Sequence, residues 1–313
     1  MTVTLPTSGP VHAARRAAAP RPLIPRRPAT PAAQRLLPRG LLIALTVALL
    51  LLVLLPVSYI VLASLNSDLG VASGEFLPSS LSFTSYDKIW STTNLSSSLG
   101  NSLVICGITA VASAVLGTST AYVLVRYAFR GRLTILRALI GLQSLPGTLM
   151  LLPIFVLFTS AGNYLGITVI NTRWGLFVAY LTFALPFSTW VMVTYLRGLP
   201  RDLEEAARID GASNLQVLTR IVLPLSLPGV VVSGIFAFLL GWNDVLFASV
   251  LTRPETQTAA IALSTFSSTQ EGGALPVYSQ VMAAALVTAA PVVALYLIFQ
   301  RYLVGGLTAG GVK

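Results

Sequence analysis

Residue types that carry out catalysis or hold metal ions are scarce in this chain of 313 residues. Its single histidine is His12 and its single cysteine is Cys106. Neither of the only lysines, Lys88 and Lys313, stands in a phosphate-binding loop of the G-x4-G-K-[ST] type. A Ser-His-Asp triad would depend on a histidine in a low-complexity tail, and a zinc site lacks ligands. The sequence therefore predicts a non-catalytic chain that binds no metal and no cofactor itself.

The charged residues that do gather form one polar stretch between two apolar ones. It contains four of the ten acidic residues, which are Asp202, Glu204, Glu205 and Asp210. Glutamate, alanine and arginine after Pro200 favour a short helix, and Gly211 can adopt the left-handed conformation that ends it. Ala206 and Ala207 leave a low surface that another protein can approach closely.

A second short helix is predicted after the turn at Gly211. Ser213 or Asn214 can cap its first turn. Four apolar residues at helical spacing predict its buried side, namely Leu215, Leu218, Ile221 and Val222. From the pattern alone two interpretations stay open: an amphipathic loop helix that lies on the membrane, and a helix that docks on another protein.

The elements that must position this stretch are membrane helices. The chain is 55% apolar and 10% charged, with a mean hydropathy of +0.80, whereas soluble domains carry about 25% charged residues. A membrane span needs ~20 apolar residues. The sequence therefore predicts an all-α integral membrane protein with six transmembrane helices, at about 41–63, 101–125, 137–160, 174–196, 222–250 and 278–303.

The distribution of lysine and arginine predicts the orientation of these spans. If the N-terminus is cytoplasmic, 17 of the 20 basic residues fall in inner segments and only Lys88, Arg173 and Arg253 fall outside. Basic residues concentrate on the cytoplasmic side of membrane proteins. We therefore expect a multi-pass plasma (inner) membrane protein with both termini in the cytoplasm and with the polar stretch on the cytoplasmic side.

The N-terminal segment differs from the rest in composition. Residues 1–38 are rich in alanine, proline and arginine and contain no acid, which predicts a disordered cytoplasmic tail. The apolar run that follows is too long for a signal peptide, so a retained first span is expected. The predicted parts are the tail 1–38, a six-helix domain 39–304 that includes the loop 197–224, and a glycine-rich cytoplasmic tail 305–313.

Polar and helix-breaking residues interrupt the predicted spans. Pro146 and Pro186 each remove a helical hydrogen bond in spans three and four. Gly241-Trp242-Asn243-Asp244 breaks span five, and Pro291 bends span six. Side chains that suit a sugar, by pairing with hydroxyls or stacking on the ring, form a candidate substrate pathway of Gln143, Ser188, Trp190, Trp242, Asn243 and Asp244. Helix–helix hydrogen bonding is the alternative, and for Asp244 a site or gate and a structural pairing stay equally open.

One spaced pattern in the polar stretch carries a family resemblance. It consists of Glu205-Ala206-Ala207, three residues, Gly211, nine residues, and then Ile221-Val222-Leu223-Pro224. This pattern resembles the EAA loop of membrane subunits of ATP-binding-cassette importers. Across residues 40–313 the chain is similar to the smaller, six-helix membrane subunit of maltose and disaccharide importers, on Asn101-Ser102-Leu103, Ala121-Tyr122 with Arg126, Trp242-Asn243-Asp244, and the ending Gly306-Leu307-Thr308-Ala309-Gly310-Gly311-Val312-Lys313.

The resemblance implies a type I importer permease fold and a transport cycle between inward- and outward-facing states. The implied partners are a second permease subunit, two copies of an ATPase that binds ATP and Mg, an extracytoplasmic sugar-binding protein and membrane lipid, with no nucleic acid. The implied substrate is maltose, a malto-oligosaccharide or a related disaccharide such as trehalose. Glu205 would lie at the ATPase contact and Gly211 would form a hinge-like turn.

The resemblance also implies two sets of residues that meet the ATPase. The coupling set is Glu204, Glu205, Ala206, Ala207, Asp210 and Gly211, and the C-terminal set is Thr308, Gly310, Gly311 and Lys313. The alternative from another class is a self-contained secondary transporter or channel for a small polar solute. That alternative predicts two matching halves and an intramembrane ion relay, and neither is evident in the sequence.

Overall fold

The computed structural model describes residues 38–92, 94–268 and 277–309, and the described part is helical with no strand. The chain divides into two compact units, residues 1–54 and 55–313. The first unit contains most of helix α1 (Arg39–Ser64), whose residues 39–58 are all exposed. A helix that is apolar all round and finds no core in its own chain is typical of a membrane span. The tail predicted at 1–38 lies, apart from Pro38, outside the described residues.

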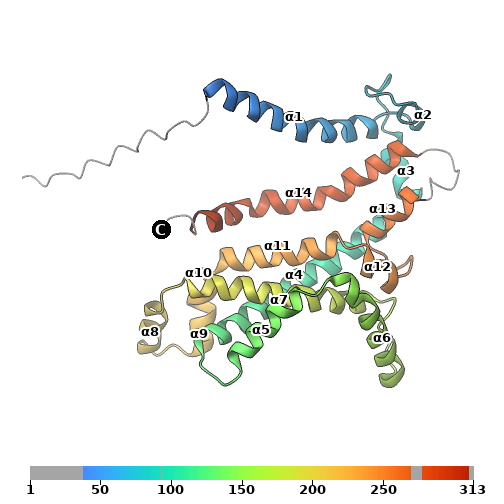
Figure 1. Cartoon of the computed structure of the whole chain (residues 1–313). Helices are drawn as coiled ribbons and strands as arrows, with labels where there is room; N and C mark the ends of the chain where they lie inside the picture. Colours follow the sequence, from blue (N-terminus) through green and yellow to red (C-terminus); the bar gives the residue numbers. More distant parts are fainter. Residues whose placement is uncertain (1–37, 93, 269–276, 310–313) are drawn as a thin grey trace, which may run out of the picture. The chain divides into compact units, whose positions relative to one another are not determined.

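The second unit contains the end of α1 and the remaining helices (Figure 1). In chain order these are α2 (Asp68–Ala72), α3 (Thr84–Thr92), α4 (Leu95–Arg126), α5 (Arg132–Gln143), α6 (Gly147–Leu165), α7 (Arg173–Arg197), α8 (Asp202–Ile209), α9 (Asn214–Val217), the π-helix η1 (Leu218–Val222), α10 (Leu223–Leu225), α11 (Leu227–Trp242), α12 (Leu246–Leu251), α13 (Ala259–Ser268) and α14 (Tyr278–Ala309).

The described helices supply the predicted membrane spans with altered bounds. Five are long and apolar enough to cross a membrane, namely α1, α4, α6, α7 and the Tyr278–Leu303 part of α14. A sixth span results if Asn214–Leu225 and α11 are taken together, although the two parts meet at a bend of 78°. The prediction of six spans therefore depends on a broken fifth one.

The third span was predicted wrongly at 137–160. The structure has two helices there, α5 and α6, with a break at Ser144-Leu145-Pro146, and only α6 is long and apolar enough to span. Proline has no N–H to donate, and it disfavours helical geometry in the residue before it. The break therefore sits where the sequence places Pro146, but it divides two helices instead of bending one.

The fifth span, predicted over 222–250 with one break at 241–244, is broken at two places in the structure. Its first break is at Ser226, whose hydroxyl donates to the carbonyl oxygen of Val222 at 2.7 Å. Pro228 follows in the first turn of α11 and lacks the N–H that would continue the helix. The second break follows Trp242, where α11 ends before α12, and it confirms the break predicted at 241–244.

The predictions made for Pro186 and Pro291 have a different outcome from the one made for Pro146. Helix α7 runs without interruption from Arg173 to Arg197 with Pro186 inside it, so the predicted break of span four is wrong. Helix α14 likewise continues through Pro291. A proline deep inside a long membrane helix costs one hydrogen bond, which neighbouring groups can compensate.

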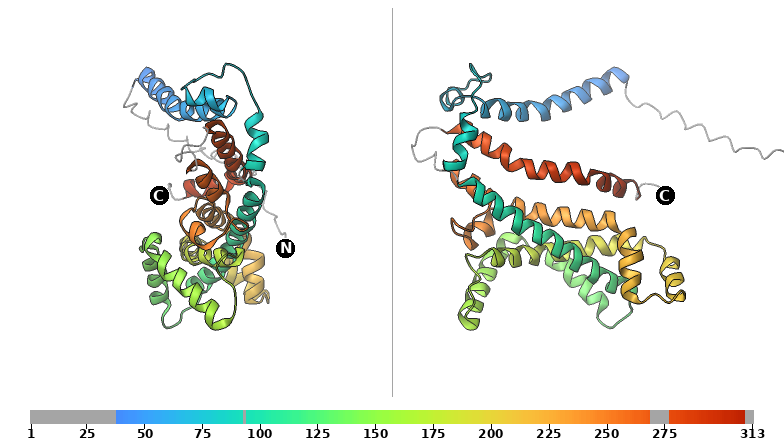
Figure 2. Two further views of the ribbon diagram at one scale, coloured as in Figure 1. Left: turned by 90° about the vertical axis from the view of Figure 1, so that its right-hand side faces the viewer. Right: turned by 180° about the vertical axis from the view of Figure 1, so that it is seen from behind.

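The core of the second unit lies where α4, α7 and α11 pack along one another (Figure 2). Small residues allow the approach of α4 to α7: a Cβ added to Gly117 would lie only 2.9 Å from the Cβ of Ser188. The hydroxyls of Ser113 and Ser188 lie 3.3 Å apart in the same buried contact. Small residues therefore allow close packing of these two helices.

The 197–224 loop and an intramembrane cavity

Helix α8 begins the predicted docking stretch, and a glycine ends it. Gly211 has a φ of 86°, in the left-handed region that an L side chain rarely adopts. Its N–H donates to the carbonyl of Arg208 at 3.1 Å, and the N–H of Ala212 donates to that of Ala207 at 2.9 Å. These two bonds form a Schellman motif, which satisfies the last carbonyl groups of α8. The predicted helix–turn geometry is therefore confirmed at Gly211.

The second helix of the loop is capped by Ser213. Its hydroxyl accepts from the N–H of Gln216 at 3.3 Å, and the side-chain oxygen of Gln216 accepts from the N–H of Ser213 at 2.8 Å. This reciprocal pair is a capping box. Of the two caps that the sequence allowed, Ser213 and Asn214, the structure uses the first.

The buried side of this helix differs from the predicted one. Val217 and Val222 are buried, whereas Leu215 is 68% exposed. Residues Leu218–Val222 form a π-helix, whose wider turn changes the residues that share a face. A regular 3.6-residue period therefore put Leu215 on the wrong side and missed Val217.

Two acidic neighbours on α8 have opposite environments. Glu204 is 3% exposed, and its Oε1 lies 2.6 Å from Nε of Arg126 at the end of α4. Its Oε2 lies 3.7 Å from a guanidinium nitrogen of Arg208. Glu205 is exposed, as are Ala206 and Asp210. The structure therefore places Glu204, which the sequence grouped with the outward-facing residues, against the chain's own helices.

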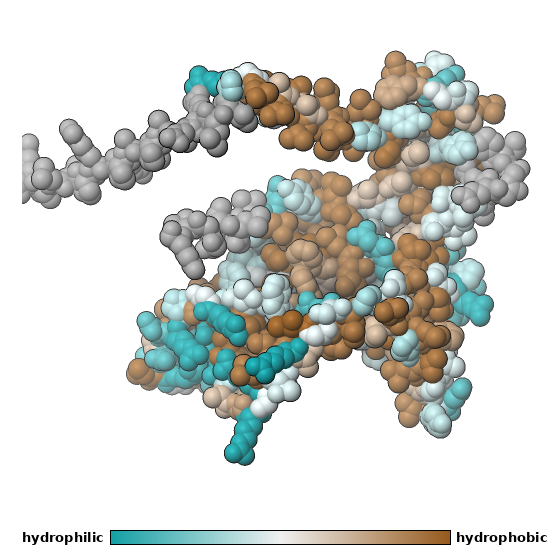
Figure 3. Space-filling view, viewed as in Figure 1, coloured by the Kyte–Doolittle hydropathy of each residue, from teal (hydrophilic) through white to brown (hydrophobic). Residues whose placement is uncertain are grey.

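A helical-face argument would have found this difference. Glu204, Ala207 and Arg208 follow the i, i+3, i+4 spacing that puts residues on one side of a helix. Ala207 packs against the buried cluster formed by the ends of α4, α7 and η1. On the other side, Leu203 and Ile209 are 48% and 86% exposed. Hydrophilic side chains gather at this end of the second unit, over α8 and α9 (Figure 3).

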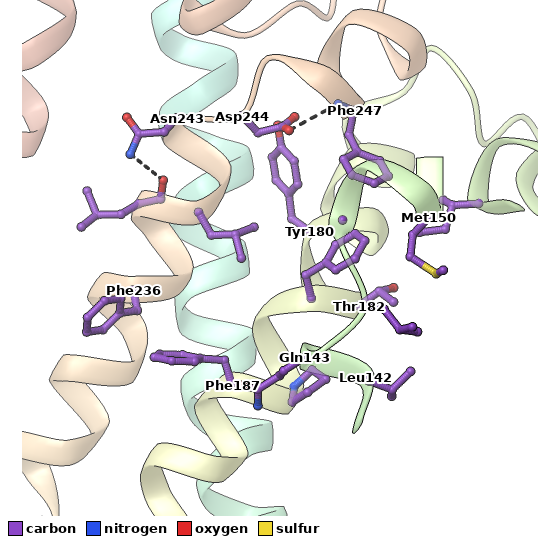
Figure 4. Close-up of a pocket in the computed structure, with 17 residues that line it drawn as sticks. Leu142, Gln143, Met150, Tyr180, Thr182, Phe187, Phe236, Asn243, Asp244 and Phe247 are labelled. Atoms are coloured by element: carbon purple, nitrogen blue, oxygen red, sulfur yellow. Dashed lines mark hydrogen bonds between the residues drawn. The ribbon is translucent and has the colours of Figure 1, made fainter. Parts of the chain in front are cut away.

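A cavity of about 780 Å³ lies among the broken helices, at the other candidate site (Figure 4). Its volume falls within the ~300–1,000 Å³ that is common for small-molecule sites. Gln143 from the end of α5, Thr182 from α7, and Asn243 and Asp244 from the break after α11 supply its polar groups. Of the predicted pathway residues, the structure therefore brings together Gln143, Asn243 and Asp244.

Aromatic side chains supply much of the cavity wall. The rings of Phe183 and Phe247 lie 5.1 Å apart between centroids, and those of Phe187 and Phe236 lie 5.0 Å apart. Figure 4 shows Phe187 near Gln143 at one end and Phe247 near Asp244 at the other. Sequence reasoning missed these phenylalanines and Tyr180, because an aromatic residue in an apolar span carries no sign of which face it occupies.

Asp244 has structural partners at the edge of the cavity. Its Oδ2 accepts from the hydroxyl of Tyr180 at 2.9 Å and from the N–H of Ala248 at 2.9 Å. Its Oδ1 accepts from the N–H of Phe247 at 3.3 Å. The carboxylate therefore caps the first turn of α12 and ties it to α7. Asn243 donates to the carbonyl of Leu239, within its own helix end.

The other three predicted pathway residues do not line the cavity. Ser188 is fully buried in the contact of α7 with α4, where its hydroxyl faces Ser113. Trp242 is buried and stacks on Phe238 at 5.1 Å. Trp190 is 43% exposed on α7. Ser188 and Trp242 therefore serve packing within the bundle, and a pathway role for these three residues stays a prediction.

The C-terminal residues predicted to reach an ATPase are mostly beyond the described part. Thr308 lies in the last turn of α14. Gly310, Gly311 and Lys313 lie outside the described residues.

Comparison with known proteins identifies the fold. The structure matches a crystal structure of a bacterial ATP-binding-cassette transporter involved in the import of the acidic polysaccharide alginate, with a TM-score of 0.69. The match covers 84% of this chain and 95% of that chain at 22% sequence identity. It therefore shows that this chain shares the fold of that transporter chain.

Sequence comparison identifies the family. The chain is 35% identical to the trehalose transport system permease protein SugB of Mycobacterium tuberculosis, over 83% of this chain and 92% of that protein. It is 30% identical to the trehalose/maltose transport system permease protein MalG of Thermococcus litoralis, over 90% and 99%. Residues 113–308 match the family described as "Binding-protein-dependent transport system inner membrane component". The chain therefore belongs to this family of inner-membrane transport components.

Proposed function

We propose that this chain is the smaller permease subunit of an ATP-driven importer for maltose, malto-oligosaccharides or a related disaccharide such as trehalose. The observation that carries the proposal is the similarity, over nearly the whole chain, to permeases named for trehalose and maltose transport. The self-contained secondary transporter that the sequence also allowed does not fit a family of binding-protein-dependent components.

The exposed side of α8 supports the coupling role in this proposal. It presents Glu205, Ala206 and Asp210 beside the exposed apolar side chains of Leu203 and Ile209. The small side chain of Ala206 and the polar rim around it suit the cleft of another protein. A separate ATPase, present in two copies with its ATP and Mg, would bind this surface, and this chain would hydrolyse nothing itself.

The cavity supports a passage for sugar. Phenylalanine rings can stack on the C–H faces of a pyranose, while Gln143, Thr182 and Asn243 can pair with hydroxyls. Asp244 holds the wall in place through Tyr180 and α12. A second permease subunit would complete the passage as a heterodimer, and an extracytoplasmic binding protein would deliver the sugar.

The proposed orientation follows the basic residues. With 17 of 20 on the inner side, both termini and the 197–224 loop would be cytoplasmic. In that orientation the C-terminal tail, with Thr308, Gly310, Gly311 and Lys313, would reach the ATPase from the same side as α8.

Reconstitution tests the proposal directly. The chain would be placed in proteoliposomes alone, and then with its second permease, its ATPase and its binding protein, and uptake of labelled trehalose and maltose would be measured with and without ATP. We expect uptake only from the complete set with ATP. Uptake by this chain alone, driven by an ion gradient, would contradict the proposal.

A further inference from the structure

An ion pair joins the docking helix α8 to the end of a long membrane helix. Among the described residues Glu204 is the only buried acidic residue, and its closest charged partner is Arg126 in the last turn of α4. Both side chains are buried, with 4% and 6% of their surface exposed. A buried charge is costly to desolvate, so its pairing with a specific partner fixes where that helix must lie.

Polar contacts around the ion pair strengthen the same junction. The guanidinium of Arg126 also donates to the carbonyl of Leu199 at 3.4 Å, and that of Arg201 donates to the carbonyl of Val125 at 3.3 Å. Arg208 donates to the hydroxyl of Tyr122 at 3.4 Å. Arginines therefore bridge the junction from both sides, and Arg201 binds a carbonyl group in the last turn of α4.

Few other contacts hold α8. Glu204 is its only fully buried residue, and Ala207 alone of its side chains packs on the neighbouring apolar cluster. The acid stands in the first turn of α8 and Arg126 in the last turn of α4, where the helix dipoles favour each charge. The position of α8 is therefore set largely by the Arg126–Glu204 pair.

Helix α4 reaches from this junction to the opposite end of the bundle. There the amide of Asn101 donates to the carbonyls of Glu255 and Gln257 at 3.1 and 3.0 Å. The hydroxyl of Ser102 accepts from the N–H of Ala259 at 2.8 Å. Helix α4 thus contacts α8 through the C-terminal end of α4 and contacts the segment after α12 through the N-terminal end of α4.

We propose that the Arg126–Glu204 pair is a positioning clasp that makes α8 and α4 move as one body during transport. Displacement of α8 is then transmitted to the membrane helices through the end of α4, as well as through the covalent connection between α7 and α8. The inference rests on the proposed function, because α8 is the surface through which a separate ATPase would act. Glu204 acts through Arg126 and does not itself touch the partner.

The first test measures coupling in the complete reconstituted transporter. Glu204→Ala removes the clasp, and Asp202→Ala is the matched control, because Asp202 is an exposed acid of the same helical turn. We expect the labelled disaccharide imported per ATP hydrolysed to fall roughly tenfold in Glu204→Ala, at normal ATPase co-purification, and to change less than about twofold in the control. An unchanged ratio in Glu204→Ala would overturn the clasp.

The second test separates a clasp from a general loss of structure. Arg126→Cys and Glu204→Cys are combined in a Cys106→Ala chain with cysteine-free partners, and the two thiols are joined by a short reductant-cleavable bis-methanethiosulfonate linker. We expect low sugar import per ATP in the reduced protein, recovery after linking, and loss again after reduction. Linking that fails to restore import, or that arrests ATP hydrolysis, would show that α8 and α4 do not move together.

A third measurement tests the clasp independently of which sugar the transporter imports. If the unaltered complex imports neither trehalose nor maltose, the proposed function fails, and the clasp is judged on the purified chain. Spin labels at Ile209→Cys and Ser119→Cys, both exposed positions in a Cys106→Ala background, report the distance between α8 and α4. We expect one narrow distance distribution that broadens when Glu204→Ala is added; equal widths would overturn the clasp.

Discussion

The 197–224 loop and the intramembrane cavity were predicted with different success, and the difference lies in how each is assembled. The loop is continuous in sequence, and its turn depends on near neighbours such as Gly211 and Ser213. The cavity collects residues between Leu142 and Phe247 from five helices and two breaks. Local spacing predicts the first kind of site well. The second kind depends on which face each helix turns inward, and that is set by packing partners distant in sequence.

Removal of Arg126 should have the largest effect and would test whether the loop is as self-contained as its sequence suggests. Arg126→Met leaves the buried carboxylate of Glu204 with only the more distant Arg208, so we expect the free energy of unfolding to fall by about 3 kcal/mol. Titration of the purified chain with SDS in mixed micelles measures it. The double variant Arg126→Met with Glu204→Leu should regain most of the loss. An equally unstable double variant would argue against a paired charge.

Replacement of Gly211 tests the local part of the loop. Proline cannot adopt a φ of 86° and cannot donate the bond to Arg208, so Gly211→Pro should cost about 3 kcal/mol locally and abolish co-purification with the ATPase. Gly211→Asn is the control, because asparagine tolerates the left-handed conformation. Normal ATPase yield from the proline variant would contradict the docking role of this turn.

A methyl group at Gly241 should disturb the cavity through packing alone. Its Cβ would lie 2.7 Å from the ring of Tyr180, which must then move away from Asp244. We expect Gly241→Ala to lower the free energy of unfolding by about 1–3 kcal/mol in the same SDS titration. Gly234→Ala is the matched control, since its Cβ would meet its nearest atom, the carbonyl oxygen of Ala110, at 3.7 Å. Equal stability of both variants would show that Tyr180 is not held as described.

The smallest expected effect is on the affinity for sugar, and it distinguishes residues that line the cavity from predicted pathway residues that do not. Gln143→Ala removes a polar group from the cavity, so the concentration of sugar for half-maximal import should rise roughly two- to tenfold, equivalent to one lost hydrogen bond. Ser188→Ala should leave that concentration unchanged, because its hydroxyl faces Ser113 instead. The reverse result would favour Ser188 over Gln143 as a pathway residue and would place the sugar outside this cavity.

The sequence by itself determined the membrane class, the helix–turn–helix of the loop and the position of two breaks, at Pro146 and at 241–244. These features follow from composition, from the missing N–H of Pro146 and from the left-handed preference of Gly211, all of which act within one or two turns of chain. The same reasoning failed for the length of spans three and five, because it could not tell a bend from a complete break.

Only the tertiary structure decided the direction of each side chain in an apolar bundle. Glu204 and Glu205 are adjacent acids of equal propensity, yet one is buried against Arg126 and the other is exposed. Ser188 and Gln143 are both polar groups in apolar helices, yet only Gln143 lines the cavity. A membrane helix is apolar on all sides, so the amphipathic pattern that marks the buried face of a soluble helix is absent. The contacts between α4, α7 and α11 supply that information instead.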